Sequence, residues 1–186
     1  TPILWTATDV NGNTSTATQT IIVQDSEDPI ITGMPSTLTF SANLGECGTN
    51  VTWAEPTATD NCEITSFTST HSSGDYFQVG TTTVSYVAIN GTGNQITSSF
   101  NVVITDNESP MVNNLPSNIT QNTDASSCGA NISWTAPNIS DNCVNYSVSQ
   151  SHNSGDFFGV GVTQVSISVT DNSGNITTES FLVEIL

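Results

Sequence analysis

Four cysteines recur at a fixed spacing in this chain of 186 residues. Cys47 and Cys62 lie fifteen positions apart, and so do Cys128 and Cys143. A zinc site needs further cysteine or histidine ligands at short spacing, and no CxxC pair accompanies these cysteines. Paired cysteines in an exported protein are typical of a disulfide framework. We therefore expect all four cysteines to form disulfide bonds.

Two disulfide pairings are compatible with this spacing. Bonds within each repeated segment, Cys47–Cys62 and Cys128–Cys143, would close loops of about 15 residues and contribute about 3 kcal/mol on the chain-entropy model. If Cys47 and Cys62 lay at opposite ends of their domain, Cys47 could instead reach Cys143. Because both cysteines occur together in each segment, we favour the pairing within the segment.

Acidic and amide side chains gather at a few places in the chain, where their oxygens could converge on a metal ion. Calcium takes six to eight oxygen ligands at about 2.3–2.6 Å. The alternative is a set of solvated acidic turns, because Asp and Asn favour turns. We favour calcium as a cofactor, since no basic side chain is present to balance these acids. The expected ligands are Asp25, Glu27, Asp28, Asp60, Asn61, Asn90, Asp106, Glu108, Asp141, Asn142 and Asp171.

The charge balance of the chain is one-sided. It contains no Lys or Arg and 17 Asp plus Glu, which gives a formal net charge of −17. Nucleic-acid binding and attraction to anionic lipid both depend on Lys and Arg, so the composition excludes nucleic acid as a partner. No run approaches the roughly 20 apolar residues of a membrane helix, so we expect no membrane insertion in this segment.

An internal repeat organises the chain. Residues 25–105 and 106–186 are the same unit written twice, 81 positions apart without a gap, and residues 1–24 match the final part of both units. A fixed period of this kind indicates an array in which each unit contacts mainly its neighbours. Function then belongs to the unit and its junctions. With no nucleophile elbow or phosphate loop in the sequence, we expect a protein that is not an enzyme.

Short alternating runs separated by turn residues predict strands and no helices. Six or seven strands in about 80 residues indicate an all-β protein built of tandem immunoglobulin-like β-sandwich repeats, with Trp53 and Trp134 as core anchors. Residues 90–94 are expected to form a hairpin loop. The strands expected in the first whole unit are Leu38–Ala42, Val51–Ala54, Ile64–Thr70, Tyr76–Val79, Thr82–Ile89 and Gln95–Thr105.

Four stretches of the sequence resemble one known family. They are CGTNVTWAEPTATDNC at residues 47–62, FQVGTTTV at 77–84, DNESP at 106–110 and VTDNSGN at 169–175. Together they resemble the HYR, or hyalin repeat, domain. The resemblance implies immunoglobulin-like sandwiches in tandem, in secreted or cell-surface proteins associated with adhesion. One departure concerns Asn90, which stands where Asp9 and Asp171 carry the family's usual acid.

The expected function is therefore mechanical. We expect a structural extracellular repeat protein that forms an extended stalk or fibre, stiffened by disulfides and by calcium between repeats. Its partners would be neighbouring repeats of the same chain or identical subunits in a fibre. The alternative is an adhesin or glycan-binding module that binds surface glycans or proteins. Exposure of the aromatic residues Tyr76, Phe77, Phe157 and Phe158 would favour this alternative, and their burial would favour the stalk.

Two further expectations concern the chain's surface and its first segment. Residues 1–24 carry two strands of a sandwich, which must be completed by earlier sequence in the same polypeptide or by a neighbouring subunit, and we favour the continuous array. Sequons mark candidate sites of glycosylation. The candidate acceptors are Asn13, Asn50, Asn90, Asn107, Asn118, Asn131, Asn138, Asn145 and Asn175.

Overall fold

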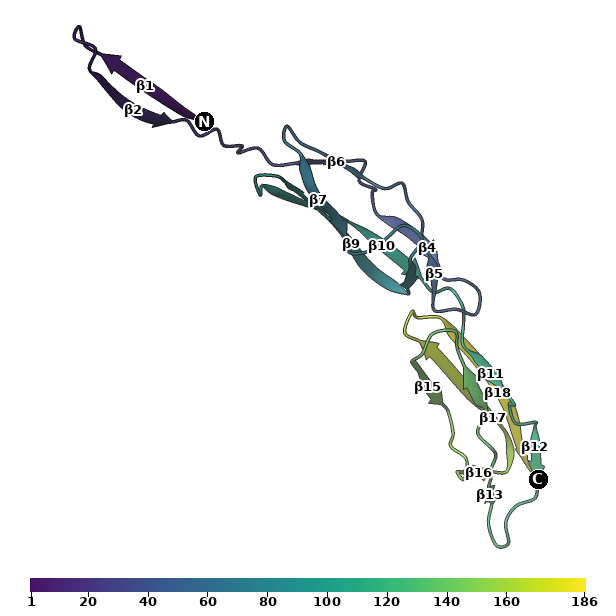
Figure 1. Ribbon diagram of the computed structural model, residues 1–186. Coiled ribbons are helices and arrows are strands. Elements are labelled where there is room, and N and C mark those ends of the chain that lie inside the picture. Colours follow the sequence, from purple (N-terminus) through teal and green to yellow (C-terminus); the bar gives the residue numbers. More distant parts are fainter. The chain divides into compact units, whose positions relative to one another are not determined.

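The computed structural model describes all residues of the chain, 1–186. It consists of strands, turns and loops, so the predicted all-β class is confirmed (Figure 1). No element of the chain is a helix with the length and apolar character needed to cross a membrane. The chain divides into two compact units, the first made of residues 1–34, 54–71 and 84–99 and the second of residues 35–53, 72–83 and 100–186.

The second repeat lies wholly within the second unit and forms a β-sandwich. One layer is a four-stranded sheet of order β12-β18-β17-β15, and two-stranded ladders β11–β14 and β13–β16 provide the other strands. The pair β12–β18 is parallel, and the other pairs are antiparallel. The strands are β11 (Met111–Asn113), β12 (Ile119–Gln121), β13 (Gly129–Asn131), β14 (Asn138–Ser140), β15 (Tyr146–Gln150), β16 (Phe157–Gly159), β17 (Gly161–Asp171) and β18 (Ile176–Ile185).

The core of the second repeat follows from alternation along its two longest strands. Successive side chains of a strand point to opposite faces, so every second residue of β17 and β18 can be apolar and buried. Trp134 packs edge-on against Phe158 of β16 and Phe181 of β18, with ring centroids 6.2 Å and 5.2 Å away. This packing places Trp134 against the core as expected. The buried core residues are Ala130, Ile132, Phe158, Val165, Ile167, Val169, Phe181, Val183 and Ile185.

The first whole repeat repeats this strand plan. Its four-stranded sheet has the order β4-β10-β9-β7, and its ladders are β3–β6 and β5–β8. Trp53 packs against Phe77 and Phe100 at 6.0 Å and 5.4 Å, as Trp134 does in the second repeat. The strands are β3 (Ile30–Thr32), β4 (Leu38–Ser41), β5 (Gly48–Asn50), β6 (Thr57–Thr59), β7 (Ile64–Ser69), β8 (Tyr76–Gln78), β9 (Gly80–Asn90) and β10 (Gln95–Thr105).

Most predicted strands of this repeat are present, but the prediction of a strand at Val51–Ala54 is wrong. The hairpin loop at residues 90–94 is confirmed by a hydrogen bond from Asn90 N to Asn94 O. No strand spans Val51–Ala54, because the regular pairing is made by β5 just before it. Val51 instead exchanges hydrogen bonds with the turn at Gly74 and Asp75, and the amide of Trp53 bonds to the Ser73 hydroxyl at 2.8 Å. The three-residue strands β3, β5 and β6 were not predicted.

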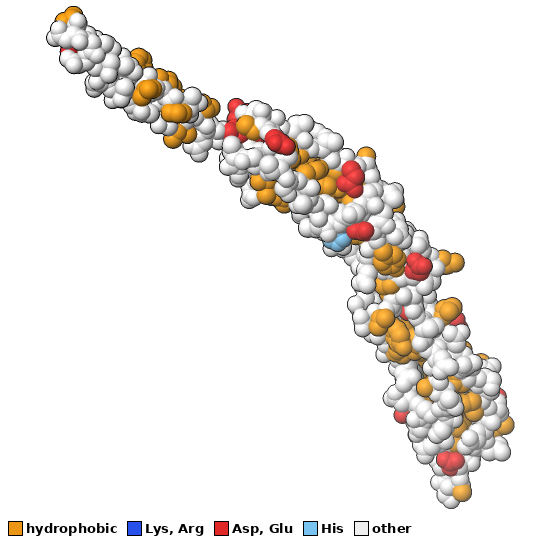
Figure 2. Space-filling view, viewed as in Figure 1, with side chains coloured by type: hydrophobic (Ala, Val, Ile, Leu, Met, Phe, Trp, Pro, Cys, Tyr) orange, Lys and Arg blue, Asp and Glu red, His pale blue; other side chains and the backbone are white.

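Residues 1–24 form a single hairpin of β1 (Pro2–Thr8) and β2 (Thr14–Thr20). Trp5 occupies the repeat position of buried Tyr86 and Ile167, yet it is 60% exposed. Ile21 and Val23 are likewise exposed, and Figure 2 shows the apolar side chains along this segment. The hairpin therefore exposes side chains at positions that are buried in the two whole repeats.

Candidate functional site at the two repeat junctions

Rows of buried apolar side chains lead directly to the acids of the second junction. In β17 the inward-facing row ends with Val169 and then Asp171, and the row of β10 continues from Ile104 to Asp106, one residue beyond the strand. Strand alternation therefore points both carboxylates inward, at the end of a sandwich core. Asp171 is 6% exposed and Asp106 is 5% exposed.

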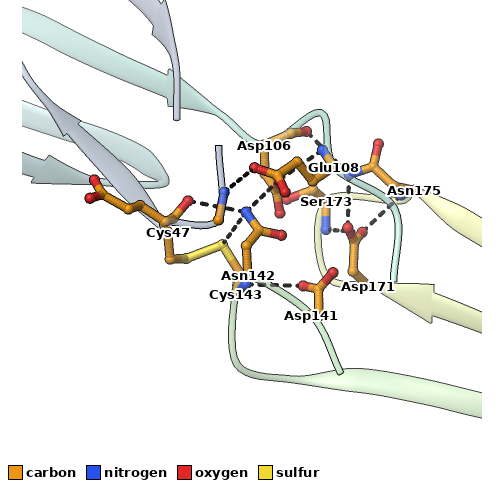
Figure 3. Close-up of a disulfide and its surroundings, with 11 residues drawn as sticks. Cys47, Asp106, Glu108, Asp141, Asn142, Cys143, Asp171, Ser173 and Asn175 are labelled. Carbon is orange, nitrogen blue, oxygen red and sulfur yellow. Dashed lines mark hydrogen bonds between the residues drawn. A yellow bond between two sulfur atoms is a disulfide. The ribbon is translucent and has the colours of Figure 1, made fainter. Parts of the chain in front are cut away.

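The second junction cluster, as we name it, brings together the carboxylates of Asp106, Asp141 and Asp171 (Figure 3). One carboxylate oxygen of each lies within 4.8 Å of the others. Asp106 Oδ1 accepts hydrogen bonds from Glu108 N at 3.1 Å and from Asn142 Nδ2 at 3.0 Å. The bond from Asn142 holds the linker residue Asp106 against the loop that carries Asp141 and Asn142.

Three oxygens of this cluster are buried without a hydrogen-bond partner: Asp106 Oδ2, Asp141 Oδ1 and Asn142 Oδ1. A buried polar atom that lacks a partner costs roughly 1–3 kcal/mol, and more when it is charged. The chain has no Lys or Arg that could approach them. Carboxylate and amide oxygens are the ligands that calcium uses, so the residues present suit that ion.

The environment shifts the pKa of two acids in this cluster. Burial raises the pKa of Asp141 above its ordinary value of 3.8, and the neighbouring carboxylates of Asp106 and Asp171 raise it further. Burial also acts to raise the pKa of Asp171. The hydrogen bonds that this carboxylate accepts, first from the Asn175 side chain and then from backbone amides, outweigh burial and leave its pKa lowered.

A disulfide joins the two repeats at this junction. It links Cys47 to Cys143, which are 96 residues apart in sequence, while Cys62 and Cys128 are free. The favoured pairing within each segment, Cys47–Cys62 and Cys128–Cys143, is therefore wrong.

The geometry of the second repeat explains why its own two cysteines cannot pair. Cys128 bonds through its carbonyl to Val160, just before β17 begins, whereas Cys143 lies beside the cluster that contains Asp171, the last residue of β17. Strands rise about 3.3 Å per residue, so the eleven residues of β17 separate the two cysteines by roughly 30 Å.

Backbone contacts reinforce the disulfide. The loop before Cys47 reaches the second repeat at two points: Gly45 N donates to Glu108 Oε1 at 2.7 Å, and Asn142 Nδ2 donates to Glu46 O at 3.1 Å. Glu108 therefore binds the loop of the first repeat and does not join the three clustered carboxylates. Sequence reasoning named Glu108 but missed the loop at Gly45 and Glu46, because nothing local in the sequence marks its partner.

The first junction cluster, as we name it, contains Asp25, Asp60 and Cys62, whose side-chain atoms also lie within 4.8 Å of one another. Asp25 Oδ1 accepts from Glu27 N at 3.1 Å and from Asn61 Nδ2 at 3.2 Å. The backbone bond from Glu27 is the largest of several hydrogen bonds that lower the pKa of Asp25. A hydrogen bond to Asp25, together with burial and nearby acids, raises the pKa of the Cys62 thiol.

Some expected site residues offer no side-chain oxygen to either cluster. Asp28 and the side chain of Glu27 are exposed, and Glu27 participates through its carbonyl, which accepts from Asn94 Nδ2 at 2.8 Å. Asn90 is 2% exposed, so the structure does not support it as a glycosylation acceptor. Asn94 was not predicted as a site residue, and its repeat counterpart Asn175 was predicted only as a glycosylation acceptor. Their signal is the spacing of four residues after Asn90 and Asp171, which allows an Asx-type turn.

These features define a class of protein: an array of β-sandwiches with buried acids and a disulfide at the junction between repeats. The HYR domain model matches residues 24–104 and 105–185, one position before the expected boundaries of the two repeats. The chain belongs to the HYR domain family.

Three curated relatives give the extent of the similarity. The chain is 38% identical to hyalin of Strongylocentrotus purpuratus over 181 residues, which cover 94% of the chain and 15% of that protein. It is 35% identical to hyalin of Lytechinus variegatus, over 100% of the chain and 36% of the relative. A rat protein with sushi, von Willebrand factor type A, EGF and pentraxin domains is 30% identical over 89% of the chain and 5% of its own length. The chain thus spans a minor part of each relative.

Proposed function

We propose that this chain is a structural segment of an extracellular or cell-surface array, without enzymatic activity, whose repeats are locked into a stiff stalk or fibre. The observation that carries the proposal is the Cys47–Cys143 disulfide between consecutive repeats. Stable disulfides belong to oxidising, extracellular environments. A bond of this kind removes hinge motion at the linker, which a binding module with independent domains would not need.

Because the cysteine positions recur in each repeat, the same bond could form at every junction of the array. Cys128 occupies the repeat position of Cys47, and Cys62 that of Cys143. In the proposed array, Cys128 pairs with a following repeat of the same kind and Cys62 with a preceding one. Identical subunits that meet head to tail would offer the same two cysteines, so the partners are neighbouring repeats in either case.

Calcium at the junction is the second component of the proposal. Its support is the set of buried oxygens without donors around Asp106, Asp141 and Asn142. An ion there would contact both the linker residue Asp106 and the loop of Asp141, so it would stiffen the same joint as the disulfide. The ligands offered are oxygens, as calcium requires.

The adhesin alternative depends on exposed aromatic residues, and the structure gives it weaker support. Phe77 and Phe158 are 2% and 3% exposed, so they are core residues. Tyr76 and Phe157 are about half exposed, but each ring covers a glycine, Gly48 or Gly129, of the neighbouring strand. Each repeat thus has one partly exposed ring, and that ring packs against the backbone of the same repeat rather than forming an aromatic platform.

Residual dipolar couplings of the oxidised and reduced chain test the stalk function. We expect one alignment tensor to fit residues 35–53 and 106–186 in the oxidised chain, and two independent tensors after the disulfide is reduced. A Cys128→Ser variant is the control, because Cys128 is free and its loss should leave the single tensor intact. Two independent tensors in the oxidised chain would contradict a stiff junction.

A further inference from the structure

The two junction clusters differ at one central residue. Asp171 is the last residue of β17, and Asn90 is the last residue of β9, at the same position of the repeat. Both side chains are buried, at 6% and 2% exposure. The difference therefore exchanges a carboxylate oxygen for an amide nitrogen at the same position of the two clusters.

The orientation of the Asn90 amide is determined by its backbone neighbours. Asn90 Oδ1 accepts hydrogen bonds from Thr92 N at 3.1 Å and from Asn94 N at 2.9 Å. A backbone N–H can only donate, so the side-chain atom that faces these two groups must be the oxygen. The nitrogen Nδ2 then points the other way, toward the acids.

Asn90 Nδ2 donates to both acids of the first cluster. It lies 2.8 Å from Asp25 Oδ2 and 2.9 Å from Asp60 Oδ2. Both carboxylates thus receive a hydrogen from a single amide group, which stands between them. The first cluster contains two carboxylates, each supplied with donors, and Asn90 stands where the second cluster has its third acid, Asp171.

Asp171 cannot supply such a donor in the second cluster. Its Oδ1 accepts from Ser173 N and Asn175 N, both at 2.8 Å, and its Oδ2 accepts from Asn175 Nδ2 at 2.7 Å. The Asp171 carboxylate accepts hydrogen bonds from the backbone amides of its turn, as Asn90 Oδ1 does. It has no hydrogen to donate to Asp106 or Asp141. One oxygen of each of those two acids, Asp106 Oδ2 and Asp141 Oδ1, is left without a hydrogen-bond partner.

We propose that the two junctions are held by different chemistry: a calcium ion between Asp106, Asp141 and Asp171 in the second, and the Asn90 amide in place of the ion in the first. The inference rests on the calcium component of the proposed function and assigns the ion to one junction of the two. In this chain Cys62 is unpaired, and its thiol, which lies beside Asp25 and Asp60, is a soft ligand that a hard cation such as calcium does not use. The 186-residue chain therefore binds one calcium ion.

Reciprocal exchange of the two residues tests this assignment. The oxidised, calcium-depleted chain and the variants Asn90→Asp and Asp171→Asn would be titrated with calcium to about 10 mM, well above the roughly 0.1–1 mM range of weak extracellular sites. Native mass spectrometry and calorimetry would count the bound ions. We expect one ion in the unchanged chain, two in Asn90→Asp and none in Asp171→Asn.

The unfolding temperature provides a second readout that does not depend on bound calcium. In calcium-free buffer, Asp171→Asn should unfold at a higher temperature than the unchanged chain, because the new amide supplies the donor that Asp106 and Asp141 lack. Asp9→Asn is the matched control. Asp9 makes the same turn bonds to Asn11 N and Asn13 N but is exposed, so its replacement should change neither ion count nor unfolding temperature.

The outcomes separate this inference from the calcium component beneath it. Two ions in the unchanged chain, or an ion that persists in Asp171→Asn, would overturn the assignment and leave calcium in the proposed function. No ion in any of the three chains would overturn both. The stiffness attributed to the disulfide is tested separately, by recording the dipolar couplings of the oxidised and reduced chain in calcium-free buffer.

Discussion

The first and second junction clusters occupy the same place in the repeat and share most of their hydrogen bonds. Asp25 and Asp106 each accept from the backbone amide two residues later, at 3.1 Å in both cases, and each accepts from the side-chain amide of the following loop. The two clusters differ at Asn90 and Asp171. The Asn90 amide donates to the two acids beside it, whereas the Asp171 carboxylate has no hydrogen to donate. The side chain at this one position thus decides whether the two neighbouring acids of a junction receive hydrogen bonds from it.

The sandwich bodies and the junctions between them depend on different features of the sequence. The sandwich bodies are alike in strand order and in the packing of their tryptophans, because an alternating apolar pattern specifies them over many residues. The junctions depend on a few polar side chains each, so one substitution alters their chemistry without disturbing the fold. An array can therefore vary its joints while keeping its units constant.

Removal of the disulfide should produce the largest difference between the junctions. Cys143→Ser opens a loop closed over 96 residues, and the chain-entropy model assigns about 4–5 kcal/mol to a loop of that size. Denaturant unfolding of the oxidised chain would measure the loss of free energy. Cys62→Ser is the matched control at the first junction and should lose far less, since Cys62 is free. Equal losses would show that the bond contributes no stability.

Replacing the same glycine in each repeat should destabilise the two sandwiches by similar amounts, in contrast to substitutions at the junctions. A Cβ on Gly129 would collide with Phe158 O and the Phe157 ring, and a Cβ on Gly48 would meet Phe77 O and the Tyr76 ring. We expect Gly129→Ala and Gly48→Ala each to cost about 1–3 kcal/mol, as for overpacking in a core.

Thermal or denaturant unfolding would compare these two variants with Gly91→Ala. At Gly91 the nearest atom would be Thr65 Cγ2 at 3.7 Å, an ordinary contact, so the cost should be small. A large loss in one repeat and none in the other would mean that the bodies are not equivalent.

Replacing an acidic residue of each linker should give a smaller difference in the free energy of unfolding. Glu108→Ala removes the acceptor of Gly45 N, and a net loss of about 0.5–1.5 kcal/mol is typical for one hydrogen bond. Glu27→Ala should have little effect, because Glu27 uses its backbone carbonyl in the first cluster and its side chain is exposed. Unfolding free energies of the two variants would be compared in calcium-free buffer, and a larger loss for Glu27→Ala would contradict this assignment.

The smallest expected effect is a different response to acid in calcium-free buffer. The pKa of Asp141 is raised from 3.8, mainly by burial, so the folded chain binds this proton more tightly than the unfolded chain. The resulting stability is present below pH 3.8 and is lost as the pH rises through the raised pKa. In the window just above pH 3.8, acidification should therefore stabilise the second junction.

Asp25 and Asp171 respond in the opposite direction and at lower pH. Both have a lowered pKa, so their contribution is present above 3.8 and is lost only as the pH falls through the lowered value. Unfolding temperatures of the unchanged chain and of Asp141→Asn across this range would test the difference. The gain in the window above pH 3.8 should disappear in Asp141→Asn, and its persistence would assign the effect to other groups.

The sequence predicted the parts of this structure that depend on pattern. Alternation along residues 95–105 corresponds to β10, and the acids Asp106, Asp141 and Asp171, which the structure brings together, were all named in advance. It did not predict which atom of Asn90 faces the acids, because that depends on two backbone amides of a closed turn. The disulfide pairing was wrong for a related reason. Fifteen residues of sequence say little about distance when the chain between two cysteines crosses the whole length of a sandwich.

The Cys47–Cys143 bond has a consequence for a chain under tension. An extended chain gains at most about 3.3–3.6 Å per residue, so the 96-residue separation across this bond corresponds to roughly 300 Å of contour length that stays withheld even if the enclosed strands come apart. In the proposed array, the next such loop opens at Cys128, before the first one closes at Cys143. Successive loops then overlap, and no stretch of the polypeptide lies outside one. Pulling such an array would release almost no slack until its disulfides were reduced.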